Sequence, residues 1–291
     1  MRDGNEDRFV VRESGGTLLM AVADGVGGGP GGEIAAGAAV DELALRFFSA
    51  KGDGAIEERL ADAIRDANTA VLRAADAAGK PQAASTLVVA VVRGDRAVIA
   101  NLGDSRAYLV RAGTSRQLTD DHSGEIAHGI TRFVGDPRGV QPDIFVEELR
   151  AGDRLLLCSD GLTRHVEPAE IAQHAVVADI DGAVKDLVAL ANARGGEDNV
   201  TVVLYVAEPR ANAGARPRAF GIAVLAAVVL LVAGGTIATL VSFALQPPPA
   251  ASPRPSLTPS ASATPTATPT ASPTPTKSPT PSPTEVPNPT L

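Results

Sequence analysis

Short apolar runs bounded by Gly, Asp, Asn or Pro predict β-strands through the first 206 residues. The predicted strands are residues 8–12, 17–24, 85–92, 97–102, 106–111, 117–119, 144–149, 154–159 and 199–206. A Gly15-Gly16 turn joins the first two. We expect 144–149 and 154–159 to pair with each other around Gly152-Asp153.

Four other segments carry apolar residues at helical spacing. Val40, Leu43, Ala44 and Phe47 follow the i, i+3, i+4, i+7 pattern of a helix face. A second helix is predicted from Ile56 to near Gly79, and two more near 168–174 and 180–193. The order lacks the strict βαβα alternation of a parallel sheet. We therefore predict an α+β fold, an antiparallel β-sandwich flanked by helix pairs in four αββα layers.

A long uncharged segment, 220–245, follows this region. It is long enough to span a bilayer of ~30 Å as a helix. A buried core helix is the alternative, but here it would have nothing to pack against. Arg210, Arg216 and Arg218 precede the segment, and positive charge stays on the cytoplasmic side. We expect a single-pass cell-membrane protein with a cytoplasmic domain and an external C-terminal tail.

Composition divides the chain further. Residues 247–291 hold 15 of its 22 prolines, with Ser, Thr and Ala in most other positions, which is typical of a disordered segment. We predict a globular domain at 1–208, a basic juxtamembrane linker at 209–219, a transmembrane helix at 220–245 and a disordered external tail at 246–291. The net charge of −8 argues against a nucleic-acid partner.

A single cysteine, Cys158, excludes a disulfide scaffold. It lies in the apolar run LLLCS. Its thiol is either a buried strand residue or a catalytic nucleophile.

Carboxylates recur at the predicted strand ends. They are Asp24, Asp104 and Asp160 after strands, and Glu6-Asp7 and Asp198 before strands. Each could be only a turn or cap former. If the strand ends share one edge, the clustered carboxylates repel one another unless a cation compensates them. Oxygen ligands favour Mg²⁺ or Mn²⁺ over zinc, so the pattern indicates a metal-dependent hydrolase.

Taken in order, the motifs around these carboxylates resemble the metal-dependent protein serine/threonine phosphatases of type 2C, the PPM family. The resemblance runs from Arg2 to about Val206. The matching pieces are Arg2 with Asn5-Glu6-Asp7, Asp24-Gly25-Val26-Gly27-Gly28 with Gly32-Glu33, Ser85-Thr86-Leu87, Gly103-Asp104-Ser105-Arg106, Leu118-Thr119-Asp120-Asp121-His122-Ser123, Ser159-Asp160-Gly161-Leu162-Thr163 and Asp198-Asn199-Val200-Thr201.

The resemblance implies unequal roles for the carboxylates. Asp24 would bridge two metal ions, and the carbonyl of Gly25 would bind one of them. Asp160 and Asp198 would complete the shell of the first ion. Asp104 would help hold a third ion, or would instead cap its turn through Ser105 and Arg106.

At the start of the chain, Glu6 and Asp7 would hold metal-bound water, and Arg2 would grip the phosphate. The family also carries a strand upstream of this arginine. We therefore expect the true start to lie before Met1, the alternative being a protein that lacks this edge strand.

The activity implied is hydrolysis of phosphoserine and phosphothreonine on proteins by water activated by two Mn²⁺ or Mg²⁺ ions. Partners would be phosphorylated proteins and Ser/Thr kinases. Val26 stands where eukaryotic members have a proposed general-acid histidine, which leaves metal-bound water as the proton donor. The segment from His122 to Gly135 is shorter than the family's flap.

Two alternatives come from other classes of protein. One is a catalytically impaired PPM-like module that binds phosphoproteins or acts as a signalling scaffold. The other is a wall-anchored structural protein whose functional part is the external tail.

Overall fold

The computed structural model describes residues 4–26, 30–50, 54–124 and 129–208. Arg2, the predicted membrane segment and the Pro-rich tail lie outside these ranges. Within them, no helix combines the length and the apolar character needed to cross a membrane.

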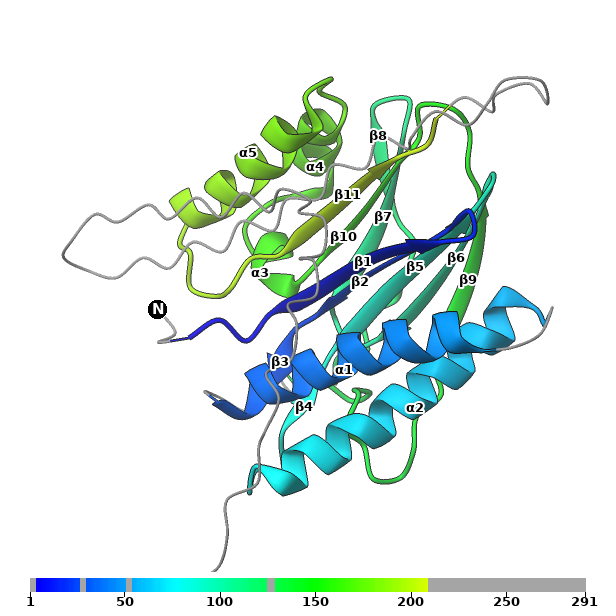
Figure 1. Ribbon diagram of the computed structural model, residues 1–291. Helices are drawn as coiled ribbons and strands as arrows, with labels where there is room; N and C mark the ends of the chain where they lie inside the picture. The colour runs from blue at the N-terminus through cyan, green and yellow to red at the C-terminus, as the bar shows by residue number, and fades with distance from the viewer. Residues whose placement is uncertain (1–3, 27–29, 51–53, 125–128, 209–291) are drawn as a thin grey trace, which may run out of the picture. The chain divides into compact units, whose positions relative to one another are not determined.

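Two antiparallel sheets form the centre of the fold (Figure 1). The first has the order β1 (Arg8–Ser14), β2 (Thr17–Ala23), β5 (Leu87–Arg93), β6 (Arg96–Leu102) and β9 (Asp143–Glu148). The second has the order β11 (Val202–Val206), β10 (Arg154–Cys158), β7 (Arg106–Arg111) and β8 (Thr114–Gln117). A short pair, β3 (Gly25–Val26) and β4 (Ala84–Ser85), forms a third sheet next to the end of β2 and the start of β5.

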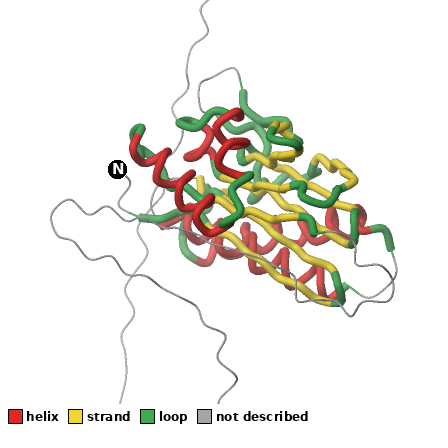
Figure 2. Tube along the Cα trace, turned by 90° about the horizontal axis from the view of Figure 1, so that it is seen from above, coloured by secondary structure: helices red, strands yellow, loops and turns green. Residues whose placement is uncertain are grey.

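Helices cover the outer face of each sheet, as Figure 2 shows with the strands in yellow between them. The helices are α1 (Pro30–Ser49), α2 (Ile56–Ala77), α3 (Asp160–Thr163), α4 (Pro168–Ala175) and α5 (Ile180–Ala193). Alternation along β2 explains the layering. Leu19 and Ala21 belong to the core with α1 and α2, whereas Leu18 and Met20 belong to the core between the sheets. A third core joins β10 to α4 and α5. The predicted four-layer sandwich is confirmed.

The predicted pairing of 144–149 with 154–159 is wrong. β9 pairs with β6, for example Val146 with Val98, and β10 pairs with β7 and β11 in the other sheet. Gly152-Asp153 turns a corner between sheets, where Asp153 accepts hydrogen bonds from Arg111 and from the backbone N–H of Arg150. A hairpin and a corner carry the same Gly-Asp turn pattern, so the sequence alone does not separate them.

Two smaller differences concern element bounds. The strand expected at 117–119 is β8, Thr114–Gln117, because the hairpin turn from β7 is at Ala112-Gly113, where both residues have positive φ. Residues 160–163, expected only as a turn after a strand, form the short helix α3.

Candidate metal centre

The strand ends that carry the carboxylates lie at one edge of each sheet. In the first sheet, the start of β1 pairs with the end of β2 (Arg8 with Ala23), and the start of β5 pairs with the end of β6 (Leu87 with Leu102). In the second sheet, the end of β10 pairs with the start of β11 through Cys158 and Val202. In Figure 1 the start of β1, α3 and β3 all lie at the left end of the sandwich.

Two long-range hydrogen bonds join these edges across the sandwich. Ser159 Oγ donates to Asp7 Oδ2 at 2.7 Å, and the backbone N–H of Glu6 donates to Asn199 Oδ1 at 2.9 Å. Asp7 and Glu6 are each only 3% exposed. The residues just before β1 are therefore held against the ends of β10 and β11.

Asp24 is fixed through its backbone. Its N–H donates to Thr86 Oγ1 at 2.9 Å, and its carbonyl accepts hydrogen bonds from Ser85 Oγ at 3.0 Å and from the N–H of Thr86 at 2.8 Å. These hydrogen bonds fix the backbone of Asp24, and none of them involves its carboxylate. Burial raises the pKa of Asp24 well above its ordinary value, and the charges of Asp7 and Asp160 raise it further.

The pKa shifts of two further carboxyls have the same main cause. Burial raises the pKa of Asp7 to about 6, against the lowering effect of hydrogen bonds from Thr201 and Ser159, and the charges of Asp198 and Asp160 add to the rise. Asp104, between β6 and β7, also has a raised pKa, through burial and then the charge of Asp160. The charges of Asp7, Asp24, Asp104, Asp160 and Asp198 act on one another, so the structure brings these five carboxylates close together.

The glycines beside these aspartates permit close backbone approach. A Cβ on Gly161 would lie 2.0 Å from the carbonyl oxygen of Asn199, and one on Gly25 would lie 2.3 Å from the backbone of Gly32. A Cβ on Gly32 would in turn lie 2.1 Å from Oε2 of Glu6. Any side chain at these three positions would push the carboxylate-bearing segments apart.

The side-chain oxygens of this cluster suit a hard divalent cation, because carboxylate oxygens are the ligands that such ions prefer. Among the described residues, Asp7 Oδ1 and Asp160 Oδ1 are buried and accept no hydrogen bond. A cation would satisfy both oxygens, and it would relieve the repulsion that adds to the effect of burial on the pKa values of Asp7, Asp24 and Asp104.

One cation is already present in the cluster. The guanidinium of Arg164 forms a short ion pair with Asp160 Oδ2, and its Nη1 lies 3.3 Å from Asp198 Oδ2. In the described ranges, no three His, Cys, Asp or Glu side chains are arranged as they stand to hold a metal ion. Metal binding at this site would require the carboxylates to rearrange.

Sequence reasoning missed the supporting roles of Ser159, Thr86 and Asn199, and it missed Arg164 altogether. The first three stand in the matched motifs, and Ser159 and Asn199 directly adjoin Asp160 and Asp198, which was the available indication. Ser105 and Arg106, considered as a cap for the Asp104 turn, have side chains engaged elsewhere: Ser105 Oγ with Thr86 Oγ1, and Arg106 with Asp121.

The thiol of Cys158 is fully buried, and burial raises its pKa to about 12. A thiol that stays protonated in the core is no nucleophile. Of the two interpretations of this cysteine, the buried strand residue is confirmed.

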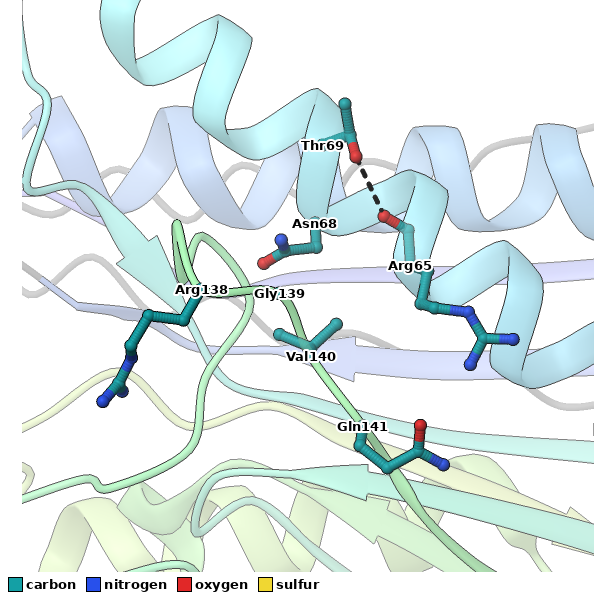
Figure 3. A pocket seen from close by; sticks show the side chains of 7 residues that line it. All are labelled: Arg65, Asn68, Thr69, Arg138, Gly139, Val140 and Gln141. Carbon is teal, nitrogen blue, oxygen red and sulfur yellow. Dashed lines mark hydrogen bonds between the residues drawn. The ribbon is translucent and has the colours of Figure 1, made fainter.

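A separate cleft of about 430 Å³ lies between α2 and the loop before β9 (Figure 3). The side chain of Asn68 bonds the loop backbone, accepting from the N–H of Gly135 and donating to the carbonyl of Asp136. Arg65 pairs with Asp62, and Arg138 pairs with Asp136. The charged groups around this cleft are therefore neutralised, and Asn68 serves to hold the loop.

Comparison with known proteins agrees with this arrangement. The family model described as Protein phosphatase 2C matches residues 3–185. The chain is 34% identical over 233 residues to the serine/threonine phosphatase stp of Listeria innocua, covering 70% of this chain and 90% of that protein.

Solved structures give the same result. The serine/threonine phosphatase of S. agalactiae superposes with a TM-score of 0.65 at 30% identity, covering 71% of this chain and 95% of that one. The catalytic domain of the phosphatase PstP, in complex with two manganese ions, superposes with a TM-score of 0.61 at 32% identity, covering 70% and 91%. Since the family model spans more than half of the chain and these relatives are 30% or more identical to it, the chain belongs to the protein phosphatase 2C family.

Proposed function

We propose that this protein hydrolyses phosphoserine and phosphothreonine on proteins in a reaction that depends on Mn²⁺ or Mg²⁺. The observation that carries the proposal is the buried carboxylate cluster, in which Asp7 and Asp24 have raised pKa values and Asp7 and Asp160 each keep a buried oxygen without a hydrogen bond. The same chemistry is supported by relatives that are serine/threonine phosphatases, one of which, PstP, has been solved in complex with two manganese ions.

In this proposal the carboxylates of Asp24, Asp160 and Asp198 and the carbonyl of Gly25 would hold two divalent ions. Asp104 would help to hold a third. When bound, the ions supply Lewis-acid activation of a water nucleophile and neutralise charge on the phosphoryl group.

The chain's own residues would orient the reactants. Asp7, held by Ser159 at 2.7 Å, and Glu6, whose N–H is held by Asn199 at 2.9 Å, would accept hydrogen bonds from the attacking water. Arg2 would bind two phosphate oxygens with its planar guanidinium. Val26, which is 37% exposed in β3, has no proton to donate, so the leaving group would take its proton from water.

The test is turnover of a phosphothreonine peptide by the full-length chain with Mn²⁺. We expect activity that is abolished by EDTA and reduced at least 100-fold in Asp160→Asn, because removal of one electrostatic partner of the reacting group typically costs that much. The matched control is Asp186→Asn, an exposed carboxylate on α5, which should retain full activity. Equal turnover with EDTA would contradict the proposal.

The same assay tests the alternative of a catalytically impaired scaffold. A chain that binds phosphoproteins without turning them over would show no Mn²⁺-dependent product at any enzyme concentration. The intact set of Asp24, Asp160 and Asp198 is the observation that favours the enzyme.

We further propose that residues 220–245 tether the domain to the cell membrane, with the domain cytoplasmic and the tail external, and that the enzyme opposes Ser/Thr kinases there. The support is the uncharged length of this segment and the arginines before it. Fractionation of cells that carry the full chain, compared with a chain ending at residue 208, tests the tether. Equal recovery of both in the soluble fraction would contradict it.

A further inference from the structure

Arg164 stands one helical turn after Asp160, at the C-terminal end of α3. Its backbone N–H donates to the carbonyl of Asp160 at 2.9 Å, which closes the turn. Its guanidinium is then positioned to form ion pairs with Oδ2 of Asp160 and, at 3.3 Å, with Oδ2 of Asp198. Two carboxylates, one at the start of α3 and one in the loop before β11, thus share one guanidinium.

The two carboxylates are far more buried than the arginine. The side chain of Asp198 is 5% exposed and that of Asp160 is 13% exposed, whereas the side chain of Arg164 is 35% exposed. Arg164 therefore reaches into the cluster from the surface, and part of its side chain stays in contact with solvent. Burial lowers the pKa of Arg164, but the charges of Asp160, Asp198 and Asp24 outweigh this and raise it, so the group stays cationic.

We propose that Arg164 is a built-in counter-cation of this cluster, which neutralises Asp160 and Asp198 in the metal-free protein and competes with the divalent ion for them. This rests on the metal centre of the proposed function. The competition is electrostatic, because a cation held beside a metal position disfavours a second positive charge there. It is also geometric, because Oδ2 of each carboxylate has one guanidinium partner that a metal would replace.

Titration of the metal-free full-length chain with Mn²⁺ by calorimetry tests the competition. Arg164→Gln removes the charge and leaves a shorter, uncharged polar side chain. We expect Arg164→Gln to bind Mn²⁺ about tenfold more tightly than the wild type. Arg164→Lys keeps the charge but cannot bridge two carboxylates as a planar fork does, so its affinity should lie between the two.

Thermal unfolding supplies the second measurement. Without metal, Arg164→Gln should unfold at a lower temperature than the wild type, because the buried carboxylates lose their counter-charge. With saturating Mn²⁺, its gain in unfolding temperature should be the larger of the two. The matched control is Arg116→Gln on β8, which removes a surface ion pair with Glu147 on β9 and should change neither measurement.

Unchanged or weaker Mn²⁺ affinity in Arg164→Gln, with the wild type binding Mn²⁺, would overturn this inference and leave the proposed function standing. Absence of Mn²⁺ binding in the wild type and in every variant would overturn both. A metal-free Arg164→Gln protein as stable as the wild type would also contradict the role of counter-cation.

Discussion

Ser159 Oγ donates a hydrogen bond of 2.7 Å to Asp7 Oδ2, and 152 positions separate the two residues along the chain. The same oxygen accepts the backbone N–H of Thr201 at 3.0 Å. One hydroxyl therefore joins three segments: the residue before β1, the end of β10 and the start of β11. It orients Asp7 and connects the edges of both sheets.

Ser159→Ala should destabilise the protein by about 1–3 kcal/mol, because a buried carboxylate oxygen and a buried N–H both lose their partner. Urea unfolding of the metal-free chain measures this. The control is Ser115→Ala, where an exposed hydroxyl donates to the carbonyl of Pro168 and the loss should stay within about 0.5 kcal/mol. Equal losses at the two serines would contradict a special role for Ser159.

The metal-free protein should be more stable at pH 5.5 than at pH 7.5. The pKa of Asp7 is raised from 3.8 to about 6 in the folded state, so the folded protein binds this proton more tightly than the unfolded chain does. Its stabilising contribution is complete below the unfolded pKa and is lost as pH rises through about 6. For Asp7 alone the difference between the two pH values is about 1 kcal/mol, and Asp24 adds to it in the same direction.

Denaturant unfolding at both pH values, in EDTA, tests this. Asp143 and Asp153 have lowered pKa values, so the stability that they contribute is lost only at lower pH. They do not change the free energy of unfolding between pH 5.5 and 7.5. With saturating Mn²⁺ the sign should reverse, because protons then compete with the metal. Stability that rises with pH in the metal-free protein would contradict the assignment.

Asp24→Asn should separate stability from metal binding. Without metal, loss of this charge relieves repulsion with Asp7 and Asp160, so the free energy of unfolding should rise. Mn²⁺ should no longer stabilise the protein in thermal unfolding, since the bridging ligand is gone. Asp186→Asn is again the matched control and should leave the free energy of unfolding and the response to Mn²⁺ unchanged. A Mn²⁺-induced gain in Asp24→Asn equal to that of the wild type would refute the bridging role.

The sequence was sufficient for the layers because period-2 and period-3.6 patterns are local. Leu18 and Leu19 alternate between two cores, and α5 begins and ends where its pattern predicted. The sequence did not predict the strands that pair with β9 and β10, because pairing depends on the sheet to which each strand belongs. The Gly152-Asp153 turn is compatible with a hairpin and with a corner between sheets.

The site followed the same division. The pattern of strand ends indicated Asp24, Asp160 and Asp198, because a residue next to the end of a strand lies at one of the two ends of its sheet. Arg164 was not predictable, since its ion pair with Asp198 depends on α3, which was expected only as a turn. The role predicted for Arg2 remains a prediction, because that residue lies outside the described ranges.

Gly161→Ala tests the tightest contact in the site. The new Cβ would lie 2.0 Å from the carbonyl oxygen of Asn199, a backbone atom that cannot rotate away. Asn199 would have to shift, and with it both Asp198 and the hydrogen bond to the N–H of Glu6. We expect a loss of about 1–3 kcal/mol, as for other overpacked sites, measured by urea unfolding.

Gly37→Ala is the matched control for this change. Gly37 lies inside α1, and a Cβ there would meet nothing within 4 Å. The same substitution should therefore stabilise the protein by about 0.5–1 kcal/mol, because alanine loses less conformational freedom in a helix than glycine does. A loss of stability in Gly161→Ala together with a gain in Gly37→Ala would show that the close contact between α3 and Asn199 requires glycine at position 161. It would exclude a general intolerance of glycine substitution. Equal signs would contradict this.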